Sequence, residues 1–98
     1  MSEHPETGPV PVGLDIVYHE VDSMLVIAVT GEVDLQTAPA LHKAVTAGIE
    51  RTRGEPCVLD LTTVTFLGSA GLTTLVEATS FGEARREPLR IVVDSTVP

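Results

Sequence analysis

The chain has 98 residues, a length that fits one domain built around a single core. Apolar residues make up 43% of it but aromatic residues only 3%, so the core must be aliphatic. The formal net charge is -8, from 14 acidic and 6 basic residues, which disfavours binding to nucleic acid or to an anionic membrane. No signal-peptide pattern is present, and no apolar run approaches the roughly 20 residues of a membrane span. We therefore expect a cytoplasmic protein.

The N-terminal segment differs in composition from the rest of the chain. Residues 1–13 carry three prolines and two glycines with few apolar side chains, which is typical of a flexible arm. Residues 14–98 would then form the folded domain. The single cysteine, Cys57, lies inside an apolar run and has no partner for an internal disulfide. We expect it to be a buried apolar side chain rather than a reactive thiol.

Two strands open the domain. Residues 14–21 (LDIVYHEV) alternate between apolar and polar, whereas residues 24–31 (MLVIAVTG) are apolar on both faces. The polar pair Asp22 and Ser23 between them predicts a hairpin. Apolar character on both faces places the second strand in the interior of a sheet.

Two segments have helical periodicity. The first covers residues 37–54, with Thr37 as the N-cap, Pro39 in the first turn and a stop that includes Arg53 and Gly54. Its apolar stripe consists of Leu41, Ala44, Val45, Gly48 and Ile49. The second helix covers residues 69–82. Its predicted stripe consists of Leu72, Leu75, Val76 and Thr79.

Strands at residues 57–66 and 88–94 complete a β-β-α-β-α-β order. Because strands separated by helices favour parallel neighbours, we predict an α/β fold: a four-stranded mixed sheet with the helices packed on one face. Asp60 lies inside the third strand, where an unpaired carboxylate costs free energy, so we expect it to cap a nearby turn. His42 and Lys43 are expected on a solvated face of the first helix.

Ser69 stands where the third strand turns into the second helix. Serine is a preferred N-cap residue, so a structural role is one interpretation. A catalytic serine is disfavoured because all three histidines precede Ser69 and Leu67 replaces the first glycine of G-x-S-x-G. A phosphate-binding loop would need its glycine-lysine motif, which is absent. The third interpretation is that Ser69 accepts a phosphoryl group, which adds about -1.5 to -2 charges and leaves the fold intact.

Two segments resemble a known family. GEVDL at residues 31–35 and DLTTVTFLGSAGL at residues 60–72 are similar to the STAS domain of bacterial anti-sigma factor antagonists, and the resemblance covers about residues 14–98. It implies a non-enzymatic protein, without metal or cofactor, that binds an anti-sigma factor and so releases a sigma factor. The anti-sigma factor would be a serine kinase with the histidine-kinase-like ATPase fold. It would inactivate the antagonist by phosphorylation, and a phosphatase would restore it.

Carried over to this sequence, the resemblance makes Ser69 the phosphoacceptor and places Glu32 and Asp34 in an acidic loop beside it. The implied partner-binding surface consists of Glu32, Asp34, Leu67, Gly68, Ser69, Ala70, Gly71 and Thr73. Without the resemblance, Glu32 and Asp34 are equally consistent with solvated turn residues.

The sequence departs from the family pattern D-S-S-G, because Gly68 replaces the aspartate and Ala70 the second serine. An alternative function therefore stays open: a STAS subunit that docks on the ATPase of a lipid ABC transporter without a phosphorylation cycle. The family also continues beyond the fourth strand into a C-terminal helix that is not among these 98 residues, which we interpret as a shortened sequence rather than as a domain without that helix. One sheet face is then expected to lack a cover, which favours a homodimer.

Overall fold

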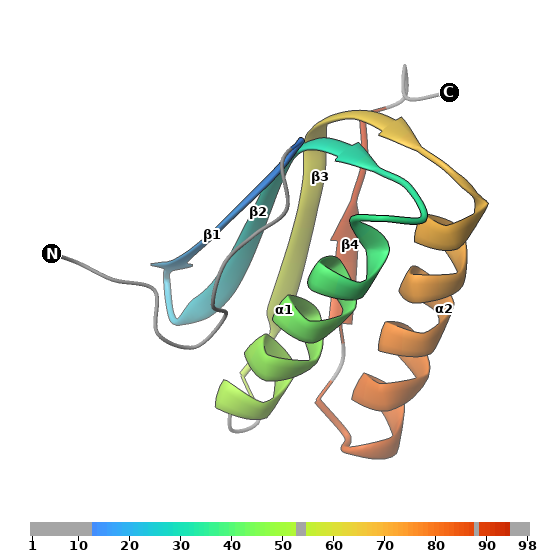
Figure 1. The fold of residues 1–98 in the computed structure, drawn as a ribbon. Helices are drawn as coiled ribbons and strands as arrows, with labels where there is room; N and C mark the ends of the chain where they lie inside the picture. The colour runs from blue at the N-terminus through green and yellow to red at the C-terminus, as the bar shows by residue number, and fades with distance from the viewer. Residues whose placement is uncertain (1–12, 53–54, 88, 95–98) are drawn as a thin grey trace, which may run out of the picture.

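The computed structural model describes residues 13–52, 55–87 and 89–94. Six elements follow one another in the predicted β-β-α-β-α-β order (Figure 1). They are β1 (Leu14–Val21), β2 (Met24–Val33), α1 (Ala38–Arg51), β3 (Cys57–Leu67), α2 (Ser69–Ala84) and β4 (Leu89–Val92). The expected N-terminal arm, apart from Gly13, and the expected helix stop at residues 53–54 lie outside the described residues.

The four strands form one mixed sheet in the order β1-β2-β3-β4. β1 and β2 are an antiparallel hairpin, whereas β2 pairs with β3 and β3 with β4 in parallel. The hairpin turn residues Asp22 and Ser23 both have positive φ, 50° and 69°, which matches the right-handed twist of the flanking strands. The predicted α/β class, the hairpin and the interior position of β2 are confirmed.

Both helices pack on the same face of the sheet (Figure 1). α1 buries its whole predicted stripe against that face. Gly48 lets α1 approach closely, because a Cβ there would lie only 2.6 Å from Cδ1 of Ile27. The hydroxyl of Tyr18 on β1 donates a hydrogen bond to the carbonyl oxygen of Ala44, so α1 is also tied to the edge of the sheet.

The buried face of α2 differs from the prediction. Half of the predicted stripe of Leu72, Leu75, Val76 and Thr79 is wrong, because Leu72 and Val76 are 53% and 66% exposed. Leu75 and Thr79 are partly buried, and Leu75 packs against the core as predicted. The residues that α2 buries are small: Gly71, Thr74, Ala78 and Gly82. Small side chains let the backbone of α2 lie close to α1 and the sheet, while Leu72 and Val76 face outward.

β3 carries two extra residues relative to β2. The register shifts between Ala28 and Thr30 and again between Gly31 and Glu32. At the first shift the carboxylate of Asp60 accepts hydrogen bonds from the backbone N–H and the hydroxyl of Thr62, at 2.9 and 2.7 Å. These two bonds, with a smaller contribution from His19, lower the pKa of Asp60. The expected structural role of Asp60 is therefore confirmed, because its carboxylate accepts the backbone N–H of Thr62 at a β-bulge.

Cys57 is fully buried at the start of β3, and desolvation raises the pKa of its thiol to about 11. At pH 8 only about one molecule in a thousand carries the reactive thiolate at that pKa. We expect a disulfide reagent to modify the native chain at least about a hundredfold more slowly than the chain in denaturant. Absorbance of the released thiol measures both rates. Equal rates would show that the thiol is accessible in the native state.

Candidate functional site

The two strand-to-helix junctions of the molecule lie next to each other at the carboxyl ends of β2 and β3. The backbone N–H of Gly68 donates a hydrogen bond to the carbonyl oxygen of Val33, with an N···O distance of 2.9 Å. This bond extends the parallel pairing of β2 and β3 by one step beyond the pair Val33 and Leu67. Open α/β sheets commonly bind ligands and partners at this end of their strands.

The junction between β2 and α1 is organised by Asp34. Its Oδ1 accepts the backbone N–H groups of Gln36 at 2.9 Å and Thr37 at 3.0 Å. Thr37 occupies the predicted N-cap position, but its hydroxyl does not cap α1. That hydroxyl instead donates to the carbonyl oxygen of Glu32 and accepts the N–H of Asp34. Hydrogen bonds within residues 32–37 therefore determine the conformation of this turn.

The hydrogen bond from Thr37 N–H is the largest influence on the carboxyl group of Asp34, and it lowers the pKa. The N–H of Gln36 and the hydroxyl of Thr37 act in the same direction. Asp34 is therefore a charged turn residue at neutral pH, and its Oδ1 is already engaged with the turn itself.

The junction between β3 and α2 exposes Ser69. Gly68 is the N-cap of α2 and Ser69 is the first helical residue, so Ser69 stands next to the N-cap rather than at it. No side chain caps this helix. The hydroxyl of Ser69 is exposed and makes no hydrogen bond with any described residue. Ser69 therefore does not cap α2.

Gly71 sets how closely α2 approaches the sheet. It is buried, and a Cβ there would lie 2.6 Å from Cδ1 of Leu67 and 2.7 Å from Cγ1 of Val33. Its role at this site is packing. Gly68 is less restricted, because its φ is -83°. A Cβ there would lie 3.2 Å from the edge of the Phe66 ring and at an ordinary contact distance, 3.6 Å, from the carbonyl oxygen of Val33.

The remaining residues of the predicted partner-binding surface lie around Ser69. Glu32 and Thr73 are exposed, and Leu67 and Ala70 are partly exposed. The hydroxyl of Thr73 donates to the carbonyl oxygen of Ser69 at 3.2 Å, one helical turn back. These residues surround one exposed hydroxyl on two adjoining elements.

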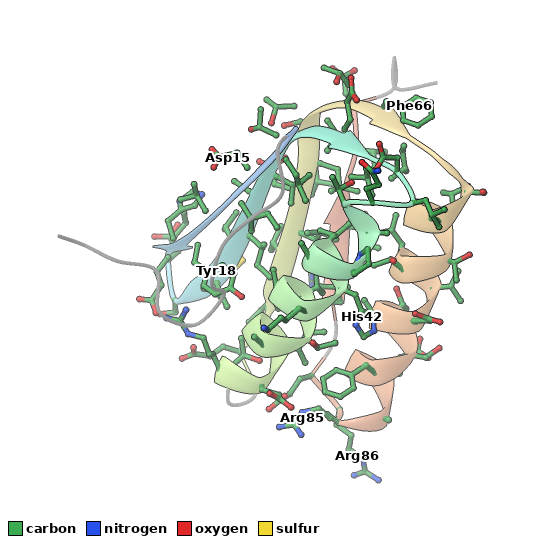
Figure 2. The ribbon with its side chains drawn as sticks, viewed as in Figure 1. Asp15, Tyr18, His42, Phe66, Arg85 and Arg86 are labelled. Carbon is green, nitrogen blue, oxygen red and sulfur yellow. The ribbon has the colours of Figure 1, made fainter. Side chains whose placement is uncertain are left out.

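Sequence analysis missed four exposed apolar side chains on the elements that flank this hydroxyl, which we call the apolar rim. The apolar rim consists of Leu35, Phe66, Leu72 and Val76, which are 80%, 50%, 53% and 66% exposed. Leu35 belongs to the β2–α1 turn, and Leu72 and Val76 lie on α2. Phe66 is the last residue but one of β3 (Figure 2), and its ring lies near Gly68. The available signal was the spacing of small residues in α2, which predicts that the opposite, larger residues face outward.

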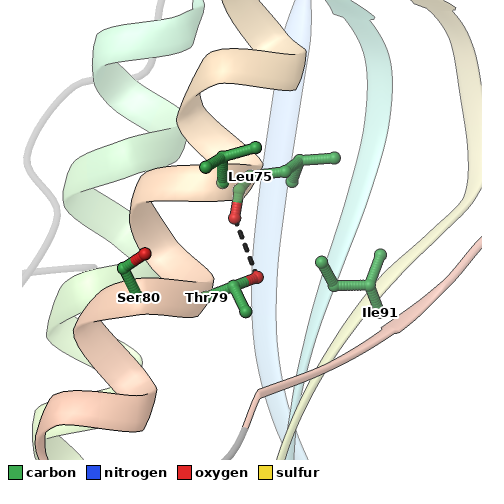
Figure 3. Close-up of a pocket in the computed structure, with 5 residues that line it drawn as sticks. Leu75, Thr79, Ser80 and Ile91 are labelled. Atoms are coloured by element: carbon green, nitrogen blue, oxygen red, sulfur yellow. Dashed lines mark hydrogen bonds between the residues drawn. The ribbon is translucent and has the colours of Figure 1, made fainter.

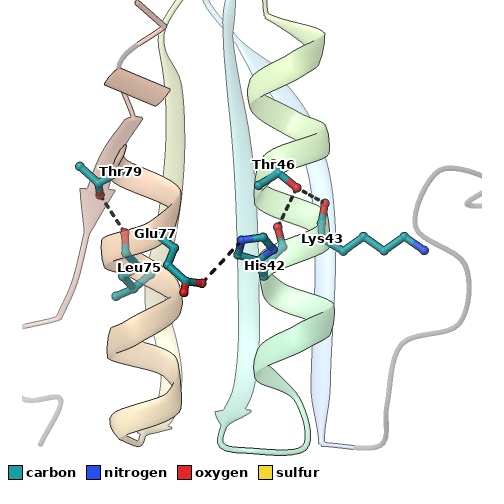
Figure 4. A network of polar contacts seen from close by, with 6 residues as sticks. All are labelled: His42, Lys43, Thr46, Leu75, Glu77 and Thr79. Carbon is teal, nitrogen blue, oxygen red and sulfur yellow. Dashed lines mark hydrogen bonds and ion pairs between the residues drawn. The ribbon is translucent and has the colours of Figure 1, made fainter. Parts of the chain in front are cut away.

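A polar contact joins the two helices away from Ser69. Nε2 of His42 on α1 lies 3.8 Å from Oε1 of Glu77 on α2 (Figure 4). His42 was expected on a solvated face, and the structure places it toward α2 instead, with its side chain 43% exposed. Lys43, its neighbour, is exposed as expected. Because the pair is half in solvent, it contributes little to stability.

An apolar groove of about 310 Å³ lies between α2 and β4 (Figure 3). It is lined by Leu75, Val76, Thr79, Ser80 and Ile91. The hydroxyl of Thr79 already donates to the carbonyl oxygen of Leu75 at 2.9 Å, so the lining offers few free polar groups. Val76 belongs both to this groove and to the apolar rim. In the described part of the chain, no helix could span a membrane and no cluster of three potential metal ligands occurs.

The family model of the STAS domain matches residues 15–93, and the chain belongs to this family. The structure is similar to that of an anti-sigma factor antagonist from Mycobacterium paratuberculosis, with 28% sequence identity and a TM-score of 0.72 over 90% of this chain and 74% of that one. No well-characterised protein matches at the sequence level.

Two more distant structures share the fold. The STAS domain of an antisigma-factor antagonist from Rhodobacter sphaeroides is 12% identical, with a TM-score of 0.69 over 83% of this chain and 87% of that one. The anti-sigma factor antagonist SpoIIAA in its unphosphorylated form is 16% identical, with a TM-score of 0.62 over 86% of this chain and 76% of that one. The resemblance to the STAS family and the predicted fold class are thus confirmed.

Gly71→Ala tests the close packing of α2. Alanine favours a helix over glycine by up to about 1 kcal/mol, but its Cβ overlaps buried Val33 and the end of Leu67, and overpacking costs about 1 to 3 kcal/mol. We expect a net loss of about 1 to 2 kcal/mol in urea unfolding. Glu83→Ala, at an exposed position of α2, is the control and should change stability by less than about 0.5 kcal/mol. A stabilised Gly71→Ala variant would contradict the close approach.

Asp34→Asn tests the turn before α1. The folded-state pKa of Asp34 is depressed, so its charge stabilises the fold above the ordinary pKa of 3.8, and this stability is lost as the pH falls through the lower folded value. We expect the variant to melt below the parent temperature at pH 7 and the difference to shrink below about pH 4. Thermal melts between pH 2.5 and 7 measure it. A difference that does not change with pH would exclude an ionised Asp34.

Proposed function

We propose that this protein is an anti-sigma factor antagonist that binds an anti-sigma factor through the surface around Ser69, and that phosphorylation of Ser69 ends the binding. The partner would be a serine kinase with the histidine-kinase-like ATPase fold, and a phosphatase would restore the unmodified form. The observation that carries this proposal is an exposed hydroxyl, without a hydrogen bond to any described residue, on elements that also carry the exposed apolar rim. Membership of the STAS family and similarity to anti-sigma factor antagonists support it.

The apolar rim supplies the energy for docking. Leu35 and Val76 are 80% and 66% exposed. Burying a large aliphatic side chain of this kind against a partner contributes about 1.5 to 3 kcal/mol. Exposed apolar groups gathered around a polar centre are typical of protein–protein contact sites. The unmodified hydroxyl of Ser69 can enter such a contact because it is small and uncharged.

A phosphate on Ser69 would not be neutralised by this chain. Residues 13–42 and 55–84, which contain both junctions, include no lysine and no arginine, whereas Glu32 and Asp34 are acidic. The N-terminus of α2 offsets only about 0.3 to 1 kcal/mol of the added charge. A partner covering the site would have to desolvate a poorly paired dianion. Shifting the population from 99% bound to 1% bound takes about 5.5 kcal/mol. The free-energy cost of desolvating the phosphate is of the same order.

The surroundings of Ser69 support binding rather than catalysis. Activation of a serine nucleophile needs a base within hydrogen-bond distance. Of the described histidines, His42 faces Glu77, and His19 lies on β1 near Asp60. Neither bonds to Ser69, so we infer a non-enzymatic role.

Charge substitutions at Ser69 test the switch. We expect Ser69→Ala to keep affinity for the cognate anti-sigma factor within about threefold and to abolish modification by kinase and ATP. Ser69→Asp should weaken binding at least about tenfold, or 1.4 kcal/mol. Ser80→Asp is the matched control, because it adds the same charge to an exposed serine of α2 about 16 Å further along the helix. Calorimetry and intact-mass analysis provide the measurements.

Two results would contradict this proposal. Modification that persists in Ser69→Ala would place the phosphoacceptor elsewhere. Equal affinity for Ser69→Asp and the parent chain would show that charge at this point does not control docking. Capture of a transporter ATPase, with no modification of Ser69, would instead favour the transport-subunit alternative.

A further inference from the structure

The sheet face opposite the two helices is apolar at its centre and partly exposed. β2, β3 and β4 pair in parallel, and parallel strands in proteins are usually covered on both faces. The helices cover only one (Figure 1). On the other face, Val17 and Val92 are 49% and 44% exposed, and Val26, Ala28 and Val58 are partly exposed. In a sheet whose second face is exposed to water, polar residues are expected at these positions.

The pairing register arranges this face into two neighbouring rows across the four strands. Val17, Ala28, Asp60 and Val92 form the first row, and His19, Val26, Val58 and Arg90 form the second. The first row has three apolar residues and the carboxylate of Asp60. The second has two apolar residues, the imidazole of His19 and the guanidinium of Arg90. We call these eight residues the open face.

The charges of the open face are self-complementary. Arg90 is exposed, and neither of the two ion pairs among the described residues involves it. The hydrogen bonds that Asp60 receives within the chain engage only its Oδ1, so Oδ2 is available. Elsewhere the protein is strongly acidic, with a net charge of -8, and two copies repel each other. On the open face, one cation and one anion allow a second copy to approach.

We propose that the open face is the interface of a homodimer in which Arg90 of each copy pairs with Asp60 of the other. A two-fold axis that lies between the rows and crosses the strands sets each row against the other row of the second copy. Stacked sheets lie about 10 Å apart, and neighbouring strands about 4.8 Å apart. Arg90 then lies opposite the second copy's Val92, one strand away from its Asp60, which is within reach of an extended arginine side chain.

This proposal does not rest on the proposed function. None of the eight residues of the open face belongs to the two junctions or to the apolar rim, so the dimer can be tested without the partner of Ser69.

Sedimentation equilibrium of the complete 98-residue chain, from about 1 µM to 1 mM, tests the proposal. We expect the mass to rise to twice the monomer mass with increasing concentration. Val92→Lys and Arg90→Glu should each raise the dimer dissociation constant at least about tenfold, since a symmetric interface contains every substitution twice. Val76→Lys is the matched control: an exposed valine of α2, outside the open face, that should leave the constant within about twofold.

The charge pair has its own test. Arg90→Glu combined with Asp60→Arg reverses both charges and should restore the dimer to within about threefold of the parent constant. Because Asp60 also bonds to Thr62, thermal melting must first show that the double variant is folded. If it does not fold, Arg90→Glu and Arg90→Lys decide instead, and the lysine variant should keep most of the affinity.

Three outcomes would overturn the proposal. One is a chain that stays monomeric at 1 mM. Another is a dimer that Val92→Lys and Arg90→Glu leave unchanged, because the interface would then lie on another surface. The last is a monomer whose proton NMR spectra show contacts from residues 1–12 to Val17 or Val92, because the chain's own N-terminal segment would then cover the open face.

Discussion

A single backbone hydrogen bond, from the N–H of Gly68 to the carbonyl oxygen of Val33, joins the two junctions on which the candidate site depends. It continues the parallel pairing of β2 and β3 past two bulges. The ends of the two strands therefore stay side by side, although β3 has two more residues than β2 over the paired stretch. Because the turn at Asp34 starts one residue after Val33, and Ser69 follows Gly68, the same bond brings the acidic turn and the exposed hydroxyl to one surface.

The second constraint is the close approach of α2. Gly71 and the other small residues on its inner side leave no room for larger ones, so Leu72 and Val76 lie on the exposed side of the helix. The inner side of the helix is fixed by packing, whereas its outer side carries the exposed apolar groups on which the proposed partner binding depends.

The order of elements, the buried stripe of α1 and the interior position of β2 could be predicted because each follows from a local pattern of large apolar residues. The inner side of α2 could not be found in the same way. A search for large apolar residues at helical spacing selects Leu72 and Val76, yet burial here depends on how near another backbone lies. At Thr37 the position of the cap was predicted correctly, but its hydroxyl bonds to Glu32, which is distant by five residues.

The sequence by itself determined the class of fold, the strand and helix segments, and the chemical groups at the two junctions, because local periodicity and a short motif encode them. Only the tertiary structure decided which side of α2 is exposed, that Asp34 is engaged in its own turn, and that Asp60 and Arg90 occupy adjacent rows of one sheet face. Those facts depend on the register between strands and on distances between backbones, which residues far apart in the chain set together.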